Sequence, residues 1–211
     1  IIMPDTMSIE RRQLVKAFGA ELMLTEGAKG MAGSIEKANE LLDKNPNYIC
    51  LGQFDNEDNP RAHYETTGPE ILKEVKDVSF IVAGIGSGGT IVGAGKFLKE
   101  KNKEIKVIGI EPKSSPLITE NKSGPHKIQG IGANFIPKIY DKDIVDKVIT
   151  VSDEDSYETV RLIANKLGIL IGISSGANIF GAMKLSDENP DKIIVTVAPD
   201  GVDKYMSMGI F

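Results

Sequence analysis

The stretch Val82–Thr90 (VAGIGSGGT) holds the residues best suited to binding chemistry in this chain. Its four glycines, one serine and one threonine lie between an apolar run that ends at Ala83 and a helical pattern over Ile91–Lys101. A loop between a strand and the first turn of a helix directs backbone N–H groups and the positive end of the helix dipole toward one point. The sequence therefore predicts a site for a phosphate or carboxylate group.

The same loop also matches a dinucleotide-binding pattern. Gly84, Gly86 and Gly89 satisfy G-x-G-x-x-G, and Glu111 ends the next strand, where an acidic residue could hold a ribose. An NAD(P)-binding oxidoreductase is therefore one hypothesis, although many glycine-rich turns match this pattern by chance. The glycines could also serve only a tight turn.

Three features favour one compact dianion over a dinucleotide. Ser87 and Thr90 add two hydroxyl groups, which together with the N–H groups form a dense and neutral cradle. A second loop of small residues, Gly172–Gly176 (GISSG), also follows an apolar run and precedes a helix. A third stretch, Gly130–Ala133, has glycines that let its backbone approach a ligand closely. Loops at the carboxyl ends of parallel strands meet at one edge of a sheet, where ligands collect.

The elements that position these loops alternate between strand and helix. The first fifty residues predict a strand at the chain start, a helix over Ser8–Phe18, a strand over Ala20–Thr25, a loop over Gly27–Gly33, a helix from about Met31 to Leu42, and a strand over Ile49–Leu51. Ser8 is a good N-cap, and Gly19 is a natural stop for the first helix. This alternation predicts a parallel sheet with crossover helices.

The rest of the chain repeats the same unit. The predicted strands are Val78–Ala83, Ile105–Ile110, Val148–Val151, Ile169–Ile171 and Ile193–Val197. We expect a helix over Arg61–Val75, broken at Gly68-Pro69 because proline interrupts a helix, and a long loop over Pro112–Pro137. Ser152 and Asp155 resemble a capping box.

Composition excludes several classes of protein. The 211 residues are 41% hydrophobic and 26% charged, as in ordinary globular proteins. The net charge of −5 makes nucleic acid or an anionic membrane an unsuitable partner, and no apolar stretch reaches the length of a membrane span. The single cysteine, Cys50, forms no internal disulfide, which favours a reducing, cytoplasmic location. Because Cys50 lies in an apolar run, we expect it to be buried.

Five stretches resemble the cysteine synthases, or O-acetylserine sulfhydrylases, of the fold-type II pyridoxal-phosphate enzymes. They are MPDTMSIERR (3–12), ETTGPEI (65–71), GIGSGGT (84–90), GPHKIQGIGANFIP (124–137) and GISSGA (172–177). The resemblance covers nearly the whole chain in the family's order. It implies an α/β fold of two domains, with parallel sheets and helices on both faces in three layers. The polar stretch Gln53–Pro60 is the candidate boundary. Residues 1–54 would then be the remaining part of the smaller N-terminal domain, and residues 55–211 the large pyridoxal-phosphate-binding domain.

The resemblance also assigns the cofactor site. Gly86, Ser87, Gly88, Gly89 and Thr90 match the loop that holds the phosphate of pyridoxal 5'-phosphate. Many members have threonine where this chain has Ser87, and either hydroxyl can donate a hydrogen bond.

A serine of the GISSG loop matches the family's partner for the pyridine nitrogen. We place it at Ser174, with Ser175 as the neighbouring alternative. A neutral hydroxyl there does not force the ring nitrogen to stay protonated, which suits β-elimination and replacement. One of the two serines could instead be a helix N-cap.

Three further residues match the family's substrate-binding positions. Gln53 matches the glutamine beside the substrate carboxylate, and its alternative role is a solvated loop amide. Gly130 and Gly132 match a segment that moves over the substrate. The two histidines are not expected to be acid–base catalysts: His126 lies in the same segment, and His63 lies in a helical pattern as a structural or surface residue.

The reaction implied by the resemblance is β-replacement, in which O-acetyl-L-serine and sulfide give L-cysteine and acetate. The choice between O-acetylserine and O-phosphoserine stays open. The resemblance also implies a homodimer and, as a partner, the C-terminal tail of serine acetyltransferase, which the family accepts in its active site. It implies no metal.

One part of the family's pattern is missing. Its catalytic lysine lies in a segment of the form S-x-K-x-R, followed by a T-S-G-N-T-G loop, and neither pattern occurs here. No catalytic residue is therefore assigned, and we expect the chain to be the C-terminal part of the enzyme, roughly two-thirds of it by length, and to be inactive alone. The alternatives are a catalytically dead ligand- or peptide-binding module and the NAD(P)-binding oxidoreductase.

Overall fold

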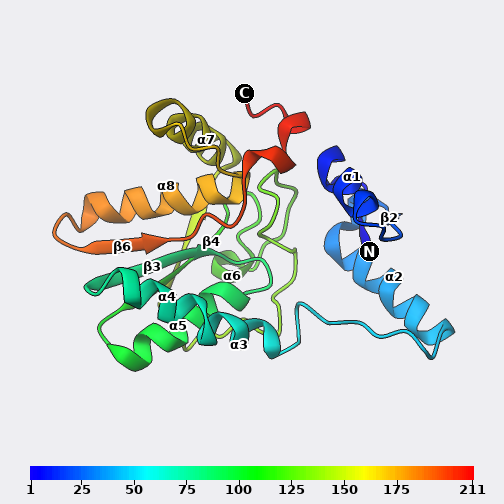
Figure 1. Cartoon of the computed structure of the whole chain (residues 1–211), viewed down its shortest axis with the longest axis horizontal. Helices are drawn as coiled ribbons and strands as arrows, with labels where there is room; N and C mark the ends of the chain where they lie inside the picture. Colours follow the sequence, from blue (N-terminus) through cyan, green and yellow to red (C-terminus); the bar gives the residue numbers. More distant parts are fainter.

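A four-stranded parallel sheet forms the centre of the structure, a computed structural model that describes all 211 residues. Its strands lie in the order β5–β4–β3–β6, and Figure 1 labels β3, β4 and β6. Their bounds are β3 Val78–Gly84, β4 Lys106–Pro112, β5 Lys147–Val151 and β6 Ile193–Thr196. Val82 of β3 pairs with Ile108 of β4 and with Thr196 of β6. The glycine loop therefore leaves the sheet from a central strand.

Helices cover both faces of the sheet, which confirms the α/β architecture in three layers (Figure 1). Val82 packs on the side of α7 and α8, whereas Ile81 and Ala83 pack on the side of α4 and α5, as the alternation of side chains along a strand requires. Helix α3 lies against α5. The bounds are α3 Asp58–Glu65, α4 Thr67–Glu74, α5 Gly89–Lys101, α7 Asp153–Leu167 and α8 Ile173–Glu188.

The first 44 residues form a separate, smaller unit beside the large sheet (Figure 1). It contains a two-stranded parallel sheet and two helices: β1 Ile2–Pro4, α1 Ile9–Ala17, β2 Met23–Thr25 and α2 Gly30–Lys44, with a 3₁₀ turn at Gly27–Lys29. The Ser8 hydroxyl caps α1 by accepting from the Arg11 N–H, and Gly19 has a φ of +79°. Both end signals of the first helix are thereby confirmed. The boundary near residue 54 stays a prediction.

The predicted strand Ile49–Leu51 and the predicted burial of Cys50 are wrong. Residues 49–51 form no strand, and Ile49 and Leu51 are 86% and 80% exposed. Cys50 is exposed too. A strand requires a neighbour that satisfies its backbone groups, and β1 and β2 form a sheet with only each other.

Four other segments differ from the sequence patterns. The helix expected over 61–75 begins earlier and is broken at Thr66 into α3 and α4. Ile169–Ile171 makes only an isolated bridge, from Ile171 to Gly201. The predicted loop Gly172–Gly176 is instead the start of α8, with Gly172 as its N-cap. Similarly, α2 begins within the loop expected over Gly27–Gly33.

The predicted start and end of α7 are confirmed. The Ser152 hydroxyl accepts from the Asp155 N–H at 3.0 Å and caps α7, which stops at Gly168. The long loop after β4 contains one short helix, α6 (Leu117–Glu120). No helix has both the length and the apolar character needed to cross a membrane.

Candidate active site

The glycine loop occupies the position predicted for it, between the end of β3 and the start of α5. Gly88 is the N-cap of α5 with a φ of +91°, a left-handed conformation that favours glycine. Gly88 has no side chain to cap this helix end, and only the Ser87 hydroxyl accepts from it, at 3.4 Å from the Gly89 N–H. The first turn of α5 therefore presents its N–H groups and the positive end of its dipole toward the loop.

A second segment, Gly130–Gly132, lies directly against the glycine loop. The Gly132 N–H donates to the Ile85 carbonyl at 3.0 Å. A Cβ added to Gly86 would collide with the Gly130 carbonyl oxygen, so alanine does not fit between these two backbones. The sequence pattern indicated a close approach at Gly130, and the structure shows that it is an approach to the glycine loop itself.

The start of α8 forms the third side of the site. Ser174 and Ser175 lie in its first turn, 4% and 0% exposed. Ser174 lines the cavity, and its Oγ would lie 3.3 Å from a Cβ on Gly130. Ser175 instead donates to the Asp200 carbonyl at 3.3 Å. Neither serine is the N-cap, because Gly172 holds that position.

These three segments enclose a cavity of about 120 Å³. Its lining residues come from the end of β3, the glycine loop, the Gly130 segment, the start of α8 and the stretch after β6: Ala83, Gly84, Gly86, Ser87, Gly88, Gly89, Thr90, Gly130, Ile131, Ser174, Asn178, Val197 and Pro199. The structure thus brings together all six predicted cofactor-binding residues and Gly130.

Two predicted substrate residues lie outside this lining. Gly132 lines a smaller neighbouring cavity of about 20 Å³. The Gln53 side chain is exposed, although its backbone carbonyl accepts from Asn59, which also bonds Ser87. Their roles toward a substrate stay predictions.

Asn178 is a lining residue that the sequence patterns missed. It is 2% exposed, one helical turn beyond Ser174 on α8. Its Nδ2 donates to the Val197 carbonyl at 2.8 Å, whereas its Oδ1 has no hydrogen-bond partner. A buried acceptor without a partner is costly, so Asn178 offers a bound molecule a hydrogen bond.

The lining suits pyridoxal phosphate. It contains no carboxylate and no lysine, and its hydroxyl groups and helix N-terminus are suitable donors to a phosphate dianion. Glycines at 84 and 86 let the Ile131 side chain and the Gly130 backbone pack directly against the loop, where a Cβ would collide with them. Ser174 and the orphaned Asn178 oxygen add neutral hydrogen-bonding groups at the other side of the cavity.

Glu111, the candidate ribose ligand of a dinucleotide, has another role. It is 2% exposed, and its carboxylate accepts from the Ile118 N–H at 2.8 Å, the Thr119 N–H at 3.1 Å and the Thr119 hydroxyl at 2.5 Å. These bonds cap α6. Glu111 also lies outside the lining of the main cavity. The acidic residue of the dinucleotide pattern, Glu111, therefore binds the start of α6 and is not available to a ribose.

His126 supports the Gly130–Gly132 segment rather than the cavity. Its Nε2 donates to the Gly132 carbonyl at 2.8 Å, and its Nδ1 is buried without a partner. It does not line the cavity. This placement fits the expectation that it is not an acid–base catalyst.

The small unit is joined to the large one next to the start of α8. Arg11 of α1 donates to the Tyr205 hydroxyl at 2.9 Å, and that hydroxyl donates to Asp200 Oδ2 at 2.6 Å. Burial and the bond to Asp200 raise the pKa of Tyr205 well above its ordinary value. Glu10 accepts from the Ser207 N–H at 2.7 Å and from its hydroxyl at 2.8 Å. These contacts, which we call the α1 clip, hold α1 against residues 200–207.

Comparisons with known proteins agree with this geometry. Residues 1–200 match the family described as pyridoxal-phosphate dependent enzyme. Cysteine synthase B of Campylobacter jejuni is 47% identical over 211 residues, which are all of this chain and 70% of that protein. Cysteine synthase A of Escherichia coli is 46% identical and is covered to 69%.

A solved structure extends the match to three dimensions. The crystal structure of cysteine synthase from Entamoeba histolytica superimposes with a TM-score of 0.93 at 43% identity and covers the whole of this chain. This chain spans 63% of that one, less than two thirds of its length. By sequence, fold and cavity, this chain belongs to the family of pyridoxal-phosphate dependent enzymes.

Proposed function

We propose that the chain is the cofactor-binding part of a cysteine synthase, an enzyme that converts O-acetyl-L-serine and sulfide to L-cysteine and acetate. The observation that carries this proposal is the cavity in which the glycine loop, Gly130 and Ser174 meet. Relatives named cysteine synthase that are 46–47% identical over the whole chain support the substrate class.

Each side of the cavity has a separate role in this proposal. The N–H groups of residues 86–90 and the hydroxyls of Ser87 and Thr90 bind the phosphate, and Ser174 faces the pyridine nitrogen. Bound pyridoxal phosphate withdraws electrons from the α-carbon of an amino acid, which allows a β-substituent to leave. Because Ser174 is neutral, it leaves the ring nitrogen free to stay unprotonated, which moderates this electron sink.

The substrate side is proposed at the open edge of the same cavity. Gly130 has a φ of +103° and is exposed, so its backbone can meet a substrate without a side chain in the way. Gln53 would bind the substrate carboxylate, and Gly132 would belong to the segment that covers it. Because Gly130 has no side chain, it shields this edge of the cavity poorly from water. Other groups would have to close the edge.

The lining contains no lysine to hold the cofactor's aldehyde or to move the α-proton. We therefore propose that the 211-residue chain alone does not turn over substrate. The test compares the purified chain with the full-length protein that carries it, by cysteine formation and by the visible absorption of lysine-bound cofactor. The proposal requires activity and absorption in the full-length protein only. Turnover by the chain alone would contradict the proposed need for an external lysine, and a full-length protein that binds no pyridoxal phosphate would favour a dead binding module.

Two assembly partners belong to the same proposal. We propose a homodimer located in the cytoplasm, and binding of the C-terminal tail of serine acetyltransferase. Sedimentation of the full-length protein measures the first. Titration with a synthetic tail peptide, with and without O-acetylserine as competitor, measures the second, and binding that O-acetylserine does not displace would contradict a shared site.

A further inference from the structure

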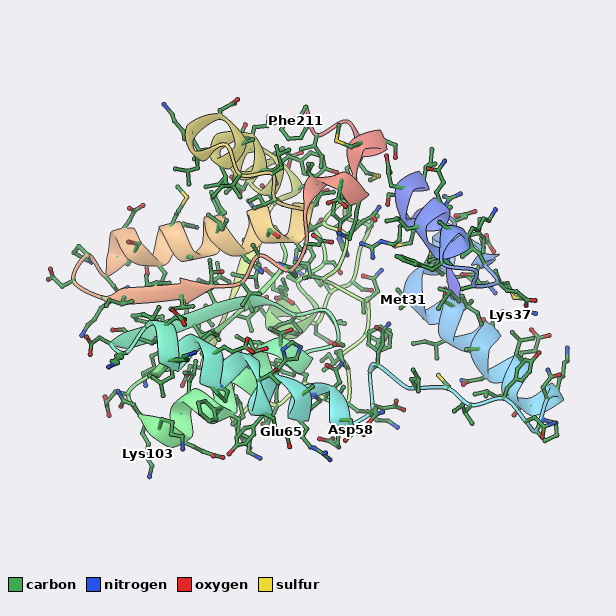
Figure 2. The ribbon with its side chains drawn as sticks, viewed as in Figure 1. Met31, Lys37, Asp58, Glu65, Lys103 and Phe211 are labelled. Atoms are coloured by element: carbon green, nitrogen blue, oxygen red, sulfur yellow. The ribbon has the colours of Figure 1, made fainter.

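Helix α3 lies directly behind the glycine loop and the start of α5. Figure 2 labels its two ends, Asp58 and Glu65. A Cβ added to Gly93 of α5 would collide with the carbonyl of Pro60, and one added to Gly89 would collide with the Asn59 side chain. Glycines on α5 thus allow α3 to approach the cavity wall from behind.

The first contact from α3 is made by Asn59. Its Nδ2 donates to Ser87 Oγ at 2.9 Å and to the Gln53 carbonyl at 2.7 Å. An amide nitrogen can only donate, so the Ser87 oxygen accepts this bond. The hydroxyl hydrogen of Ser87 is therefore free to donate elsewhere, and Ser87 lines the cavity.

The second contact is made by His63, one helical turn later on the same face of α3. Its Nε2 lies 3.1 Å from Thr90 Oγ1, and its Nδ1 lies 2.8 Å from Thr67 Oγ1. If Nδ1 accepts from the Thr67 hydroxyl, Nε2 carries the hydrogen and donates to Thr90. The Thr90 hydrogen is then free to point into the cavity. In the opposite tautomer, the Thr90 hydrogen would point back at His63, and only oxygen lone pairs would face an anion.

We propose that Asn59 and His63 are positioning residues that turn the hydroxyl hydrogens of Ser87 and Thr90 toward the cofactor's phosphate. This inference rests on the proposed cofactor site and adds the two α3 residues that contact the loop from behind. The two residues touch neither the phosphate nor the reacting atoms. Each donates to one loop hydroxyl, so both hydroxyls present a hydrogen to a dianion rather than a lone pair.

The surroundings of His63 support the required protonation state. The side chain is half-buried, and loss of solvent lowers the pKa of His63 below its usual value. A neutral imidazole has one donor and one acceptor, which matches the two hydroxyl groups that it contacts. Two hydroxyl groups that both donate would also explain how the loop can bind a dianion, although its lining contains no lysine or arginine.

Paired substitutions separate the two ring nitrogens. In His63→Gln the amide nitrogen takes the place of Nε2 and can still donate to Thr90, whereas in His63→Asn the shorter amide reaches only the Thr67 side. The readouts are affinity for pyridoxal phosphate and for inorganic phosphate, and the ³¹P shift of bound cofactor, in the full-length protein. We expect His63→Asn to lose about tenfold or more in both affinities and His63→Gln to stay within about threefold. The control is Tyr64→Phe, which removes a bond from α3 to Glu100 on the far side from the loop.

The tautomer is measured directly by ¹⁵N NMR of histidine-labelled, cofactor-free protein. The proposal requires Nε2 to carry the hydrogen, and Thr67→Val, which leaves the loop untouched, should weaken that preference. A hydrogen on Nδ1 instead, or equal phosphate affinity in His63→Asn, His63→Gln and wild type, would overturn it. A wild-type protein that binds neither pyridoxal phosphate nor phosphate would refute the cofactor site itself, so the two failures are distinguishable.

Discussion

Gly86→Ala tests whether the close approach of two backbones forms the phosphate cavity. A Cβ at residue 86 would collide with the Gly130 carbonyl oxygen. The collision partner is backbone, so it cannot be relieved by turning a side chain. Either the glycine loop or the Gly130 segment has to move, and both line the cavity.

The size of the effect follows from this geometry. Overpacking of a close contact costs about 1–3 kcal/mol. If the collision is relieved by moving the cavity wall, this cost is subtracted from the binding free energy of the ligand. A loss of about 1.4 kcal/mol in binding free energy lowers affinity about tenfold. We therefore expect Gly86→Ala to weaken pyridoxal-phosphate binding by about 5- to 150-fold.

The assay is a titration of cofactor-free full-length protein with pyridoxal phosphate, together with urea unfolding. Gly124→Ala is the matched control, because its Cβ would collide with another backbone carbonyl, that of Ser114, and neither residue lines the cavity. The control should lose comparable stability and keep its affinity. Affinity within twofold of wild type in Gly86→Ala, or an equal loss in Gly124→Ala, would refute this account of the cavity.

Three further predictions concern the scaffold. Ser152→Ala removes the cap of α7 and should lower the free energy of unfolding by about 1 kcal/mol, whereas Ser152→Asp should keep most of it; urea unfolding measures both. Tyr205→Phe leaves the half-buried Asp200 with one hydrogen bond fewer and should cost about 1–3 kcal/mol, and an unchanged midpoint would show that this bond contributes nothing. Because burial lowers the pKa of His63, the unfolded chain binds the extra proton first, so cofactor-free protein should lose stability as pH falls below about 6.5. His63→Gln should make that decline shallower, and equal slopes in both proteins would contradict it.

Local signals in the sequence located the site well. Val78–Gly84, the glycine loop and α5 follow from an apolar run, turn residues and helical spacing, all of which act over a few neighbouring residues. The cap at Ser152 and the stops at Gly19 and Gly168 are local in the same sense. Such features are encoded where they form, so a short window of sequence is enough to predict them.

Features that depend on distant partners were missed. Cys50 and its apolar neighbours looked like a buried strand, but burial depends on which segment lies alongside, and the pattern of three residues cannot specify that. Asn178 and Asn59 match no motif on their own, since their bonds to Val197 and Ser87 form only after folding. His63 could have been noticed from its spacing of four residues from Asn59 on one helix face, yet its partner Thr90 is 27 positions away.

The α1 clip has a consequence for how the chain is made. Arg11 and Tyr205 are 194 positions apart, and Glu10 and Ser207 are 197 apart. During synthesis, α1 leaves the ribosome well before residues 200–207, so its docking partner is missing until those residues have been translated. Contacts across such a span form slowly, because the entropy cost of closing a long loop comes before any contact that offsets it. Residues 1–44 are thus synthesised before their docking partner and are among the last to reach their final position. A chain that ends before residue 200 lacks every partner residue of the α1 clip.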